Sequence, residues 1–154
     1  MSSGGRKALE LSASERENVE NVIRGHAAFN GGDIEAALEF IAPDLELHPG
    51  IGGALTGKTV YRGHDGFRRY MADITDAFED LMIEPQSISA RNEWVVIAAK
   101  VSGRGRSGQV ELATDMTIVW RVRDGKGIWC TTYFQRAEAL DDIGLTEDDL
   151  KPAD

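Results

Sequence analysis

The segment from 110 to 136, VELATDMTIVWRVRDGKGIWCTTYFQR, constrains the fold more than any other part of the chain. Two β-prone runs flank Asp124-Gly125, and this dipeptide is a strong hairpin signal because both residues tolerate a positive φ. Each arm carries apolar or aromatic residues on both faces, which a half-solvated hairpin would not show. The segment therefore predicts two long paired strands within a sheet that the rest of the chain covers.

Two helices are expected near the start of the chain. Ser12 and Ser14 are each followed three residues later by a glutamate, the spacing of a capping box, so the first helix begins near them. It ends at the Asn-Gly-Gly sequence of residues 30–32, because glycine there accepts a positive φ. Asp33 then caps a second helix, which Pro43 is expected to end.

A third helix begins after residues 63–66, and its apolar period is the clearest in the chain. Its apolar stripe consists of Phe67, Tyr70, Met71, Ile74 and Phe78. Strands are expected at 45–48, at 81–90 and from residue 94 onward. The unbroken apolar run at 94–99 is typical of a central strand that is covered on both faces.

Helices followed by strands predict an α+β domain. We expect a cone-shaped, curved antiparallel sheet, covered on its concave face by the three N-terminal helices, with a pocket inside. The expected divisions are a flexible N-terminus at 1–11, the cone domain at 12–140 and an acidic C-terminal tail at 141–154. The tail carries six acidic residues and one lysine, so we expect it to be solvated.

The composition excludes several classes of function. The net charge of −9 disfavours nucleic acid as a partner, because an acidic chain repels phosphates. No run approaches the roughly 20 apolar residues of a membrane span, so no membrane partner is expected. The first residues contain no apolar signal segment, which predicts a cytoplasmic location. Cys130 is the single cysteine and is expected to be a buried, inert thiol.

Four segments of the chain carry a resemblance to a known family. They are FNGGDIEAALEFIAPDLELHP (29–49), YRGHDGFRRYM (61–71), TIVWRVRDGKGIW (117–129) and YFQRAEALDDIGL (133–145). The chain resembles the nuclear transport factor 2-like superfamily, in its SnoaL-like branch related to polyketide cyclases and ketosteroid isomerase. The resemblance implies a cone fold that usually dimerises through the outer face of its sheet. It implies no single activity, because the fold hosts several enzyme classes and non-catalytic binding modules.

The chain departs from the ketosteroid isomerase pattern at each catalytic position. Such sites use a carboxylate base after the first strand, with a helix tyrosine and a protonated aspartic acid holding the oxyanion. Here His26 lies near the tyrosine position, and the first strand ends at His48-Pro49 without a carboxylate. Thr117 falls at or near the late-strand position. Ketosteroid isomerisation is therefore not expected.

Asp115, His48 and His26 are the candidate catalytic residues. A buried aspartate inside an apolar strand is costly unless it is paired or neutralised. Asp115 is therefore a general acid or base with a raised pKa, one partner of a salt bridge with Arg121 or Lys100, or a residue exposed at the start of the strand. His48 is either a base or a satisfied polar residue at a strand end. His26 lies on the apolar stripe of the first helix and is either a catalyst or a histidine of the core or the pocket wall.

A second set of residues is expected to bind the substrate. These residues are Thr117, Tyr61, Tyr70, Cys130, Thr132 and Phe134. In the hairpin, we expect the face with Asp115 and Thr117 to point into the pocket, together with Cys130, Thr132 and Phe134 by the resemblance. The other face is expected to meet a second subunit through Ile118, Trp120, Trp129 and Tyr133.

Two functions fit this pattern. One is a cofactor-independent isomerase, cyclase or dehydratase that acts by proton transfer on a small apolar substrate. The other is a non-catalytic module for binding a small molecule or for dimerisation. No metal is expected, because three scattered histidines and Asp115 lack the spacing of a ligand set. No cofactor is expected, and a homodimer is the expected assembly.

Overall fold

Seven strands form one curved sheet, in the order β2-β1-β6-β5-β4-β3-β7. The computed structural model describes residues 10–49, 60–106 and 111–153. The helical elements are α2 (Ala13–Asn30), α3 (Ile34–Leu38), α5 (Gly63–Ala77), α6 (Arg136–Ile143) and the 3-10 turn η1 (Glu147–Asp149). The strands are β1 (Ile41–His48), β2 (Tyr61–Arg62), β3 (Phe78–Arg91), β4 (Trp94–Gly105), β5 (Glu111–Arg123), β6 (Lys126–Tyr133) and β7 (Lys151–Pro152).

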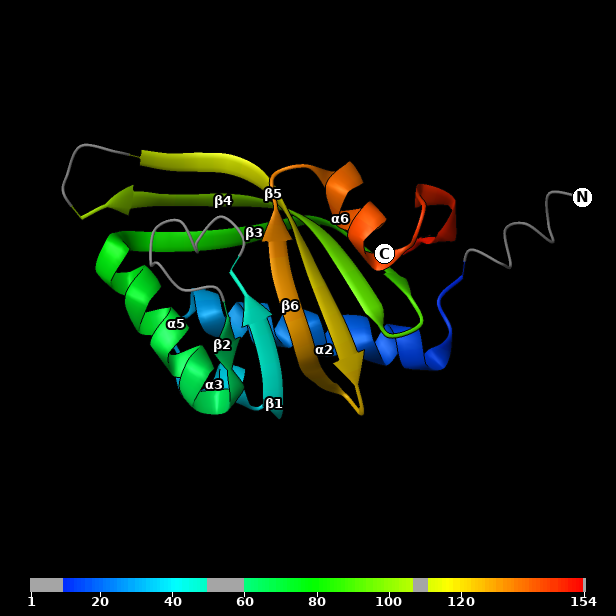
Figure 1. Cartoon of the computed structure of the whole chain (residues 1–154), viewed down its shortest axis with the longest axis horizontal. Helices are drawn as coiled ribbons and strands as arrows, with labels where there is room; N and C mark the ends of the chain where they lie inside the picture. The colour runs from blue at the N-terminus through cyan, green and yellow to red at the C-terminus, as the bar shows by residue number, and fades with distance from the viewer. Residues whose placement is uncertain (1–9, 50–59, 107–110, 154) are drawn as a thin grey trace, which may run out of the picture.

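The helices lie on both sides of the sheet (Figure 1). Helices α2, α3 and α5 cover one face, here called the inner face, while α6 and the C-terminal segment lie on the other, the outer face. The predicted α+β fold with a curved sheet is confirmed. The sheet is mixed rather than antiparallel, because β1 pairs in parallel with β6. The other pairings between the described strands are antiparallel.

The predicted hairpin is confirmed as the β5–β6 pair. Its turn residues have positive φ angles, 53° at Asp124 and 78° at Gly125. Strand β4 lies between β3 and β5, and its residues Val95, Val96 and Ile97 are each fully buried. A strand that is apolar on both faces therefore lies in the middle of the sheet, as the sequence predicted.

The predicted second helix is wrong in its length. Helix α3 ends at Leu38, and the chain is already in strand β1 at Ile41. Pro43 lies within β1, where the register against β6 shifts between Ile41 and Glu46. A proline lacks the N–H that a regular ladder needs, so it is accommodated at this irregularity.

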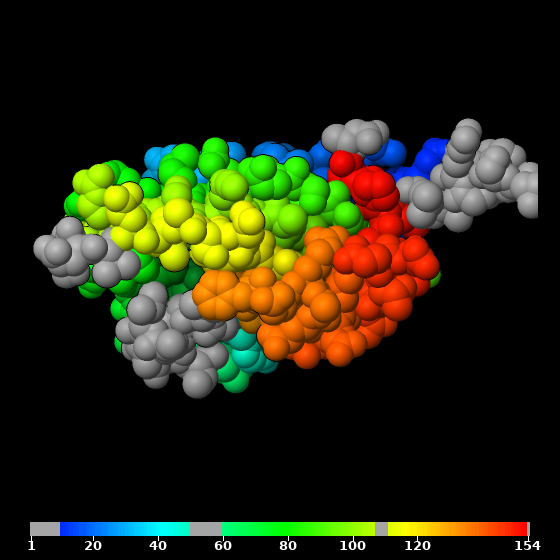
Figure 2. Space-filling view, turned by 90° about the horizontal axis from the view of Figure 1, so that it is seen from above, coloured from blue at the N-terminus to red at the C-terminus, as the bar shows by residue number. Residues whose placement is uncertain are grey.

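The C-terminal segment packs on the outer face instead of being solvated, so that prediction is wrong. Strand β7 pairs with β3, and Leu150 is only 4% exposed. Leu150 joins a buried cluster with Ala139 and Leu140 of α6 and with the outer-face residues Val96 and Val119. Figure 2 shows α6 in orange and the C-terminal segment in red, gathered over one end of this face.

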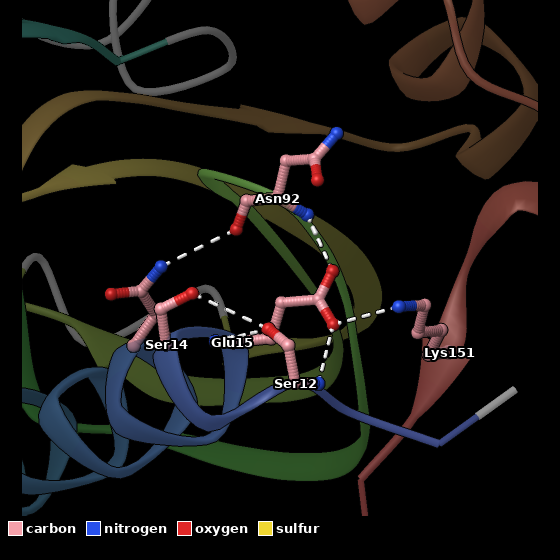
Figure 3. Close-up of polar contacts among 6 residues, drawn as sticks. Ser12, Ser14, Glu15, Asn92 and Lys151 are labelled. Carbon is pink, nitrogen blue, oxygen red and sulfur yellow. Dashed lines mark hydrogen bonds and ion pairs between the residues drawn. The ribbon is translucent and has the colours of Figure 1, made fainter. Parts of the chain in front are cut away.

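The buried carboxylate of Glu15 connects the C-terminal segment to the start of α2 (Figure 3). Glu15 is 2% exposed and accepts hydrogen bonds from the amides of Ser12 at 2.8 Å and Asn92 at 2.7 Å, and from Lys151 Nζ at 3.0 Å. The Ser12 hydroxyl in turn accepts from the Glu15 amide, so the predicted capping box is confirmed at this serine. We call Glu15, Ser12, Asn92 and Lys151 the Glu15 clasp.

Residues 1–9 of the predicted flexible N-terminus lie outside the described residues. Within the described ranges, the structure contains no helix with the length and hydrophobicity needed to cross a membrane.

Candidate ligand cavity

A cavity of about 160 Å³ lies between the inner face of the sheet and helices α2, α3 and α5. Its aromatic lining residues are Phe29, Phe40, Phe67, Tyr70, Phe78, Trp120 and Phe134. Met71, Met116 and Ile118 are among the aliphatic and thioether side chains that complete the wall. A cavity of this volume is large enough for a ligand with one benzene ring.

The described lining of the cavity carries no permanent charge. None of these residues is Asp, Glu, Lys or Arg. The polar residues among them are His26, His48, Tyr70, Cys130, Thr114, Thr131 and Thr132. The described ranges also hold no group of three or more His, Cys, Asp or Glu side chains that could bind a metal ion. Such a wall favours an uncharged ligand, because an isolated charge loses its hydration there.

His26 of α2 and Trp120 of β5 form a hydrogen-bonded pair in the wall. The Trp120 Nε1–H donates to His26 Nε2 at 3.0 Å. An indole nitrogen can only donate, so Nε2 accepts and the neutral imidazole carries its proton on Nδ1. Burial lowers the pKa of His26 from 6.5 to about 4, which keeps the ring neutral at pH 7. The hydrogen bond from Trp120 thus sets the tautomer of His26, and burial favours its neutral form.

The other ring nitrogen of His26 is buried without a partner. Nδ1 makes no hydrogen bond to any described residue. A buried donor that is left unpaired costs about 1–3 kcal/mol, so such groups are uncommon in native proteins. This N–H is the one unsatisfied buried side-chain polar atom in the described part of the chain.

Two glycines make room for the aromatic residues beside this pair. A Cβ atom on Gly127 of β6 would lie 2.6 Å from Trp120 Cζ3, and one on Gly25 of α2 would lie 3.0 Å from Phe40 Cδ2. The Phe40 and Trp120 rings meet edge to face with centroids 5.0 Å apart. The absence of side chains at these two positions therefore lets the His26–Trp120–Phe40 group pack as it does.

Four of the predicted substrate-binding residues line the cavity. Burial raises the pKa of both Tyr70 and Cys130, so these groups remain a phenol and a thiol at pH 7. The Thr132 hydroxyl donates to the carbonyl oxygen of Pro49 at 2.9 Å. Phe134 is 53% exposed, which places it where the cavity meets solvent.

His48 also borders the cavity, but its imidazole is held elsewhere. Its Nε2 lies 3.2 Å from Glu46 Oε1, and its ring packs against Trp129 with centroids 5.8 Å apart. The hydrogen bond from His48 and the contact with Arg62 lower the pKa of Glu46. His48 is therefore an imidazole paired with a carboxylate at the border of the cavity.

Asp115 does not face the cavity, so the predicted orientation of β5 is wrong. Its side chain is 84% exposed and lies 3.6 Å from Lys100 Nζ, which was the salt-bridge alternative. Thr117 is buried on the same outer face of the strand and does not line the cavity either. The opposite parity, which includes Ile118 and Trp120, faces inward rather than toward a second subunit.

Tyr61 and Tyr133 also lie outside the described cavity wall. Tyr61 is 2% exposed, and its hydroxyl donates to Asp73 Oδ2 at 2.7 Å. Its ring packs against Tyr70 with centroids 5.2 Å apart, so it supports the wall from behind. Tyr133 lies on the outer face and donates to Asp142 Oδ2 of α6 at 2.9 Å. The predicted contact of Tyr133 with a second subunit is replaced by a contact with α6.

The sequence reasoning missed the partner of His26. Trp120 was assigned to the outer face because both parities of β5 are apolar and nothing in that strand alone separates them. The register of the hairpin decides which residues of β5 share a face with those of β6. Trp120 is paired with Cys130 and Ile118 with Thr132, so side chains across each pair share one face. The inward assignment of Cys130 and Thr132 therefore required Ile118 and Trp120 to point inward as well.

Comparisons with solved structures agree with this fold. A protein of unknown function from Burkholderia pseudomallei, described as NTF2-like, has a TM-score of 0.70 at 20% identity, over 81% of this chain and 95% of that chain. TerC, co-crystallised with polyporic acid, has a TM-score of 0.70 at 23% identity, over 83% and 98%. A protein from Jannaschia sp. assigned as a SnoaL-like polyketide cyclase has a TM-score of 0.70 at 17% identity, over 89% and 98%.

Sequence identities of 17–23% show that these proteins share the fold of this chain, and they show neither a shared activity nor a shared ligand. No curated protein matches the chain. The model of the SnoaL-like domain matches residues 22–128, which is more than half of the 154 residues and includes the C-terminal half of α2, the hairpin turn and most of the cavity wall. The chain therefore belongs to the SnoaL-like domain family.

Proposed function

We propose that this protein binds a small, uncharged and largely apolar molecule in the cavity between the sheet and helices α2, α3 and α5. The observation that carries the proposal is the described wall, which is lined with aromatic side chains and holds no charged one. Apolar cavities with a few polar groups are the usual form of small-molecule sites. The sequence alone left binding and catalysis open, and the geometry favours binding as the basic function.

The binding proposal is tested with a matched pair of substitutions. Met116→Trp places an indole in the cavity wall, whereas Met82→Trp makes the same change at a residue that is 41% exposed and outside the described wall. We expect acetophenone, an uncharged probe with one ring, to bind the wild type and Met82→Trp equally in calorimetry. Met116→Trp should lose this binding. Equal affinity in all three proteins would contradict the proposed site.

A second candidate function is proton transfer on the bound molecule. It is favoured by the His48–Glu46 pair at the border of the cavity, since a histidine held by a carboxylate is a common general base. Isomerase and cyclase chemistry is the class that we propose, because several proteins of this fold carry polyketide cyclase assignments. Asp115 has no part in this proposal.

Mass spectrometry separates the two candidates. A compound that co-purifies and is released unchanged from denatured protein supports binding alone. A bound compound whose mass or structure changes with time supports catalysis. His48→Gln should then stop the change and leave the affinity intact. If conversion continues in His48→Gln, His48 is not the base.

We also propose a homodimer, restricted to the part of the outer face that α6 leaves open. This strip holds Trp94 and Trp129, whose rings meet edge to face at 5.6 Å, with Arg121 lying 5.3 Å from the Trp94 ring centroid. Half-buried tryptophans of this kind are enriched at protein interfaces. Sedimentation at micromolar concentration should show a dimer that Trp129→Ala weakens, and a clean monomer would rule it out.

We also propose a cytoplasmic location. Cys130 is free and buried, which fits a reducing compartment.

A further inference from the structure

Residues 145–153 lie against the edge of the sheet in the way that a bound peptide does. Strand β7 pairs antiparallel with residues 89–90 of β3. The amide of Ala153 continues this pairing by donating to the carbonyl oxygen of Ile88 at 2.8 Å. An extended segment that adds a strand to a sheet edge is a common mode of peptide recognition.

Two side chains of the segment fill sites of different chemistry beside this edge. Leu150 is 4% exposed and packs into an apolar site. Lys151 Nζ lies 3.0 Å from Oε1 of Glu15, whose side chain is 2% exposed (Figure 3). The apolar site is formed by Val96, Val119, Tyr133, Ala139 and Leu140. We call the β3 edge at 88–90, this apolar site and Glu15 together the β3 groove. The β3 groove therefore takes an extended backbone that carries a leucine followed by a cation.

The segment is shaped by hydrogen bonds of its own. The Thr146 amide donates to Asp149 Oδ2 at 2.9 Å, and the Asp149 amide donates to the carbonyl oxygen of Thr146 at 3.0 Å. The Leu150 amide donates to the carbonyl oxygen of Glu147 at 3.2 Å. None of these three bonds involves the β3 groove. The segment is thus a preorganised ligand, which loses less conformational freedom on binding than a flexible one.

Gly144 is the hinge that joins the segment to α6. Its φ of 72° and ψ of 28° are left-handed, a conformation that glycine adopts and leaves at little cost. The Leu145 amide donates to the carbonyl oxygen of Leu140 at 3.0 Å, and Arg136 pairs with Glu147 at 2.7 Å. The Glu147 side chain is 61% exposed, so solvent screens this ion pair. A change in the backbone angles of one glycine therefore redirects the whole segment.

We propose that two copies of this chain exchange residues 145–153, so that each segment fills the β3 groove of the other copy. An empty groove leaves a strand edge unpaired and the buried Glu15 carboxylate without its cation, and both are costly. The segment of a second copy brings the same leucine, lysine and backbone, so it matches the groove at each point. The exchange is independent of the ligand cavity and of the outer-face strip that holds Trp94 and Trp129.

A peptide tests whether the β3 groove accepts the segment from outside its own chain. The probe is a labelled synthetic peptide with the sequence of residues 145–154, and fluorescence anisotropy measures its binding to the full-length chain. In Leu150→Asp/Lys151→Glu the groove is intact but the tethered segment no longer fits, because one carboxylate would enter the apolar site and the other would face Glu15. We expect this variant to bind the peptide about tenfold more tightly than the wild type, in which the tethered segment competes.

The control for the peptide experiment is the same peptide with Lys151→Glu, which should not bind either protein. If the folded Leu150→Asp/Lys151→Glu chain binds neither peptide, the groove takes the segment only within its own chain and the proposal is wrong. Equal binding of both peptides would contradict the role of Glu15 in recognition.

A second measurement tests the exchange itself and applies even if the charged variant does not fold. Gly144→Ala and Gly32→Ala are matched, because the two glycines have φ angles of 72° and 76° and a Cβ at either would meet nothing within 4 Å. Only Gly144 is the hinge of the segment. Alanine disfavours the left-handed conformation, so we expect Gly144→Ala to raise the equilibrium constant for dimerisation about fivefold over Gly32→Ala in sedimentation. A dimer through the outer-face strip contributes equally to both variants. Equal dimer fractions would therefore overturn the exchange.

Discussion

Helix α2 buries two ionisable side chains, one with all its hydrogen bonds formed and one with a ring nitrogen left unpaired among the described residues. Glu15, at its start, is 2% exposed and accepts three hydrogen bonds. His26, three turns later, is 8% exposed, and one of its two ring nitrogens has no partner among the described residues. A buried group that is fully satisfied contributes to holding the fold. A buried group left unsatisfied instead costs free energy, so His26 Nδ1 does not contribute to the fold as the Glu15 carboxylate does.

Both groups make stability depend on pH, but in different windows. Burial alone would raise the pKa of Glu15, and the amides of Ser12 and Asn92 with Lys151 outweigh it, so its pKa is lowered. Burial lowers the pKa of His26 to about 4. Acid removes stability in both cases, because the unfolded chain takes up a proton before the folded chain does. The loss from His26 begins at higher pH than the loss from Glu15.

The largest expected effect comes from breaking the Glu15 clasp. Glu15→Ala leaves Lys151, which is 18% exposed, without its carboxylate and leaves the Asn92 amide without its acceptor. We expect a loss of about 3–5 kcal/mol in the free energy of unfolding, as for other broken buried pairs. Urea unfolding followed by circular dichroism measures it.

Glu17→Ala is the matched control for the clasp, since Glu17 is exposed on the same helix. It should change the unfolding free energy by no more than about 0.5 kcal/mol. A similar small loss in both variants would show that the Glu15 hydrogen bonds are not needed for stability.

The next effect concerns the titration of His26. The unfolded histidine has a pKa of 6.5 and the folded one about 4, so stability is lost as pH falls from about 6.5 to 4. The size of this loss is on the order of 3 kcal/mol. Urea unfolding at several pH values should show it in the wild type, and His26→Phe should remove this part of the slope. Parallel slopes in the two proteins between pH 6.5 and 5 would show that His26 is not buried as a neutral ring.

A smaller effect is expected when the Trp120 side of the pair is disturbed. In Gly127→Ala, the new Cβ would lie 2.6 Å from Trp120 Cζ3, so the indole has to move. We expect a loss of about 1–3 kcal/mol from overpacking, together with a change in Trp120 fluorescence and weaker acetophenone binding. Gly31→Ala is the control, because a Cβ there meets nothing closer than 3.5 Å. Equal effects of both substitutions would contradict this packing account.

The sequence predicted the elements of the fold well where local signals agree. The capping box at Ser12, the hairpin turn at Asp124-Gly125 and the doubly covered strand β4 each follow from a short pattern with one physical reading. Prediction failed around Pro43, where an apolar run fits a helix and a strand equally. The parallel pairing of β1 with β6 decides between them, and it joins residues far apart in the chain.

The candidate site was harder to predict because it depends on which face of β5 points inward. Both faces are apolar, since α6 and the C-terminal segment cover part of the outer one. The acidic composition of that segment concealed Leu150, which anchors it. The orphaned nitrogen of His26 was beyond reach for the same reason, because it depends on the contact between α2 and Trp120.

The smallest expected effect belongs to Asp115, the residue on which the sequence placed most weight. Its carboxylate is 84% exposed and lies 3.6 Å from Lys100 Nζ, and solvent screens such a pair strongly. Asp115→Asn should therefore change the unfolding free energy by no more than about 0.5 kcal/mol and leave acetophenone affinity and any turnover intact. A loss of turnover with normal folding would show that Asp115 takes part in catalysis after all. That outcome would require β5 to present its other face to the ligand, and the His26–Trp120 bond would then have to break.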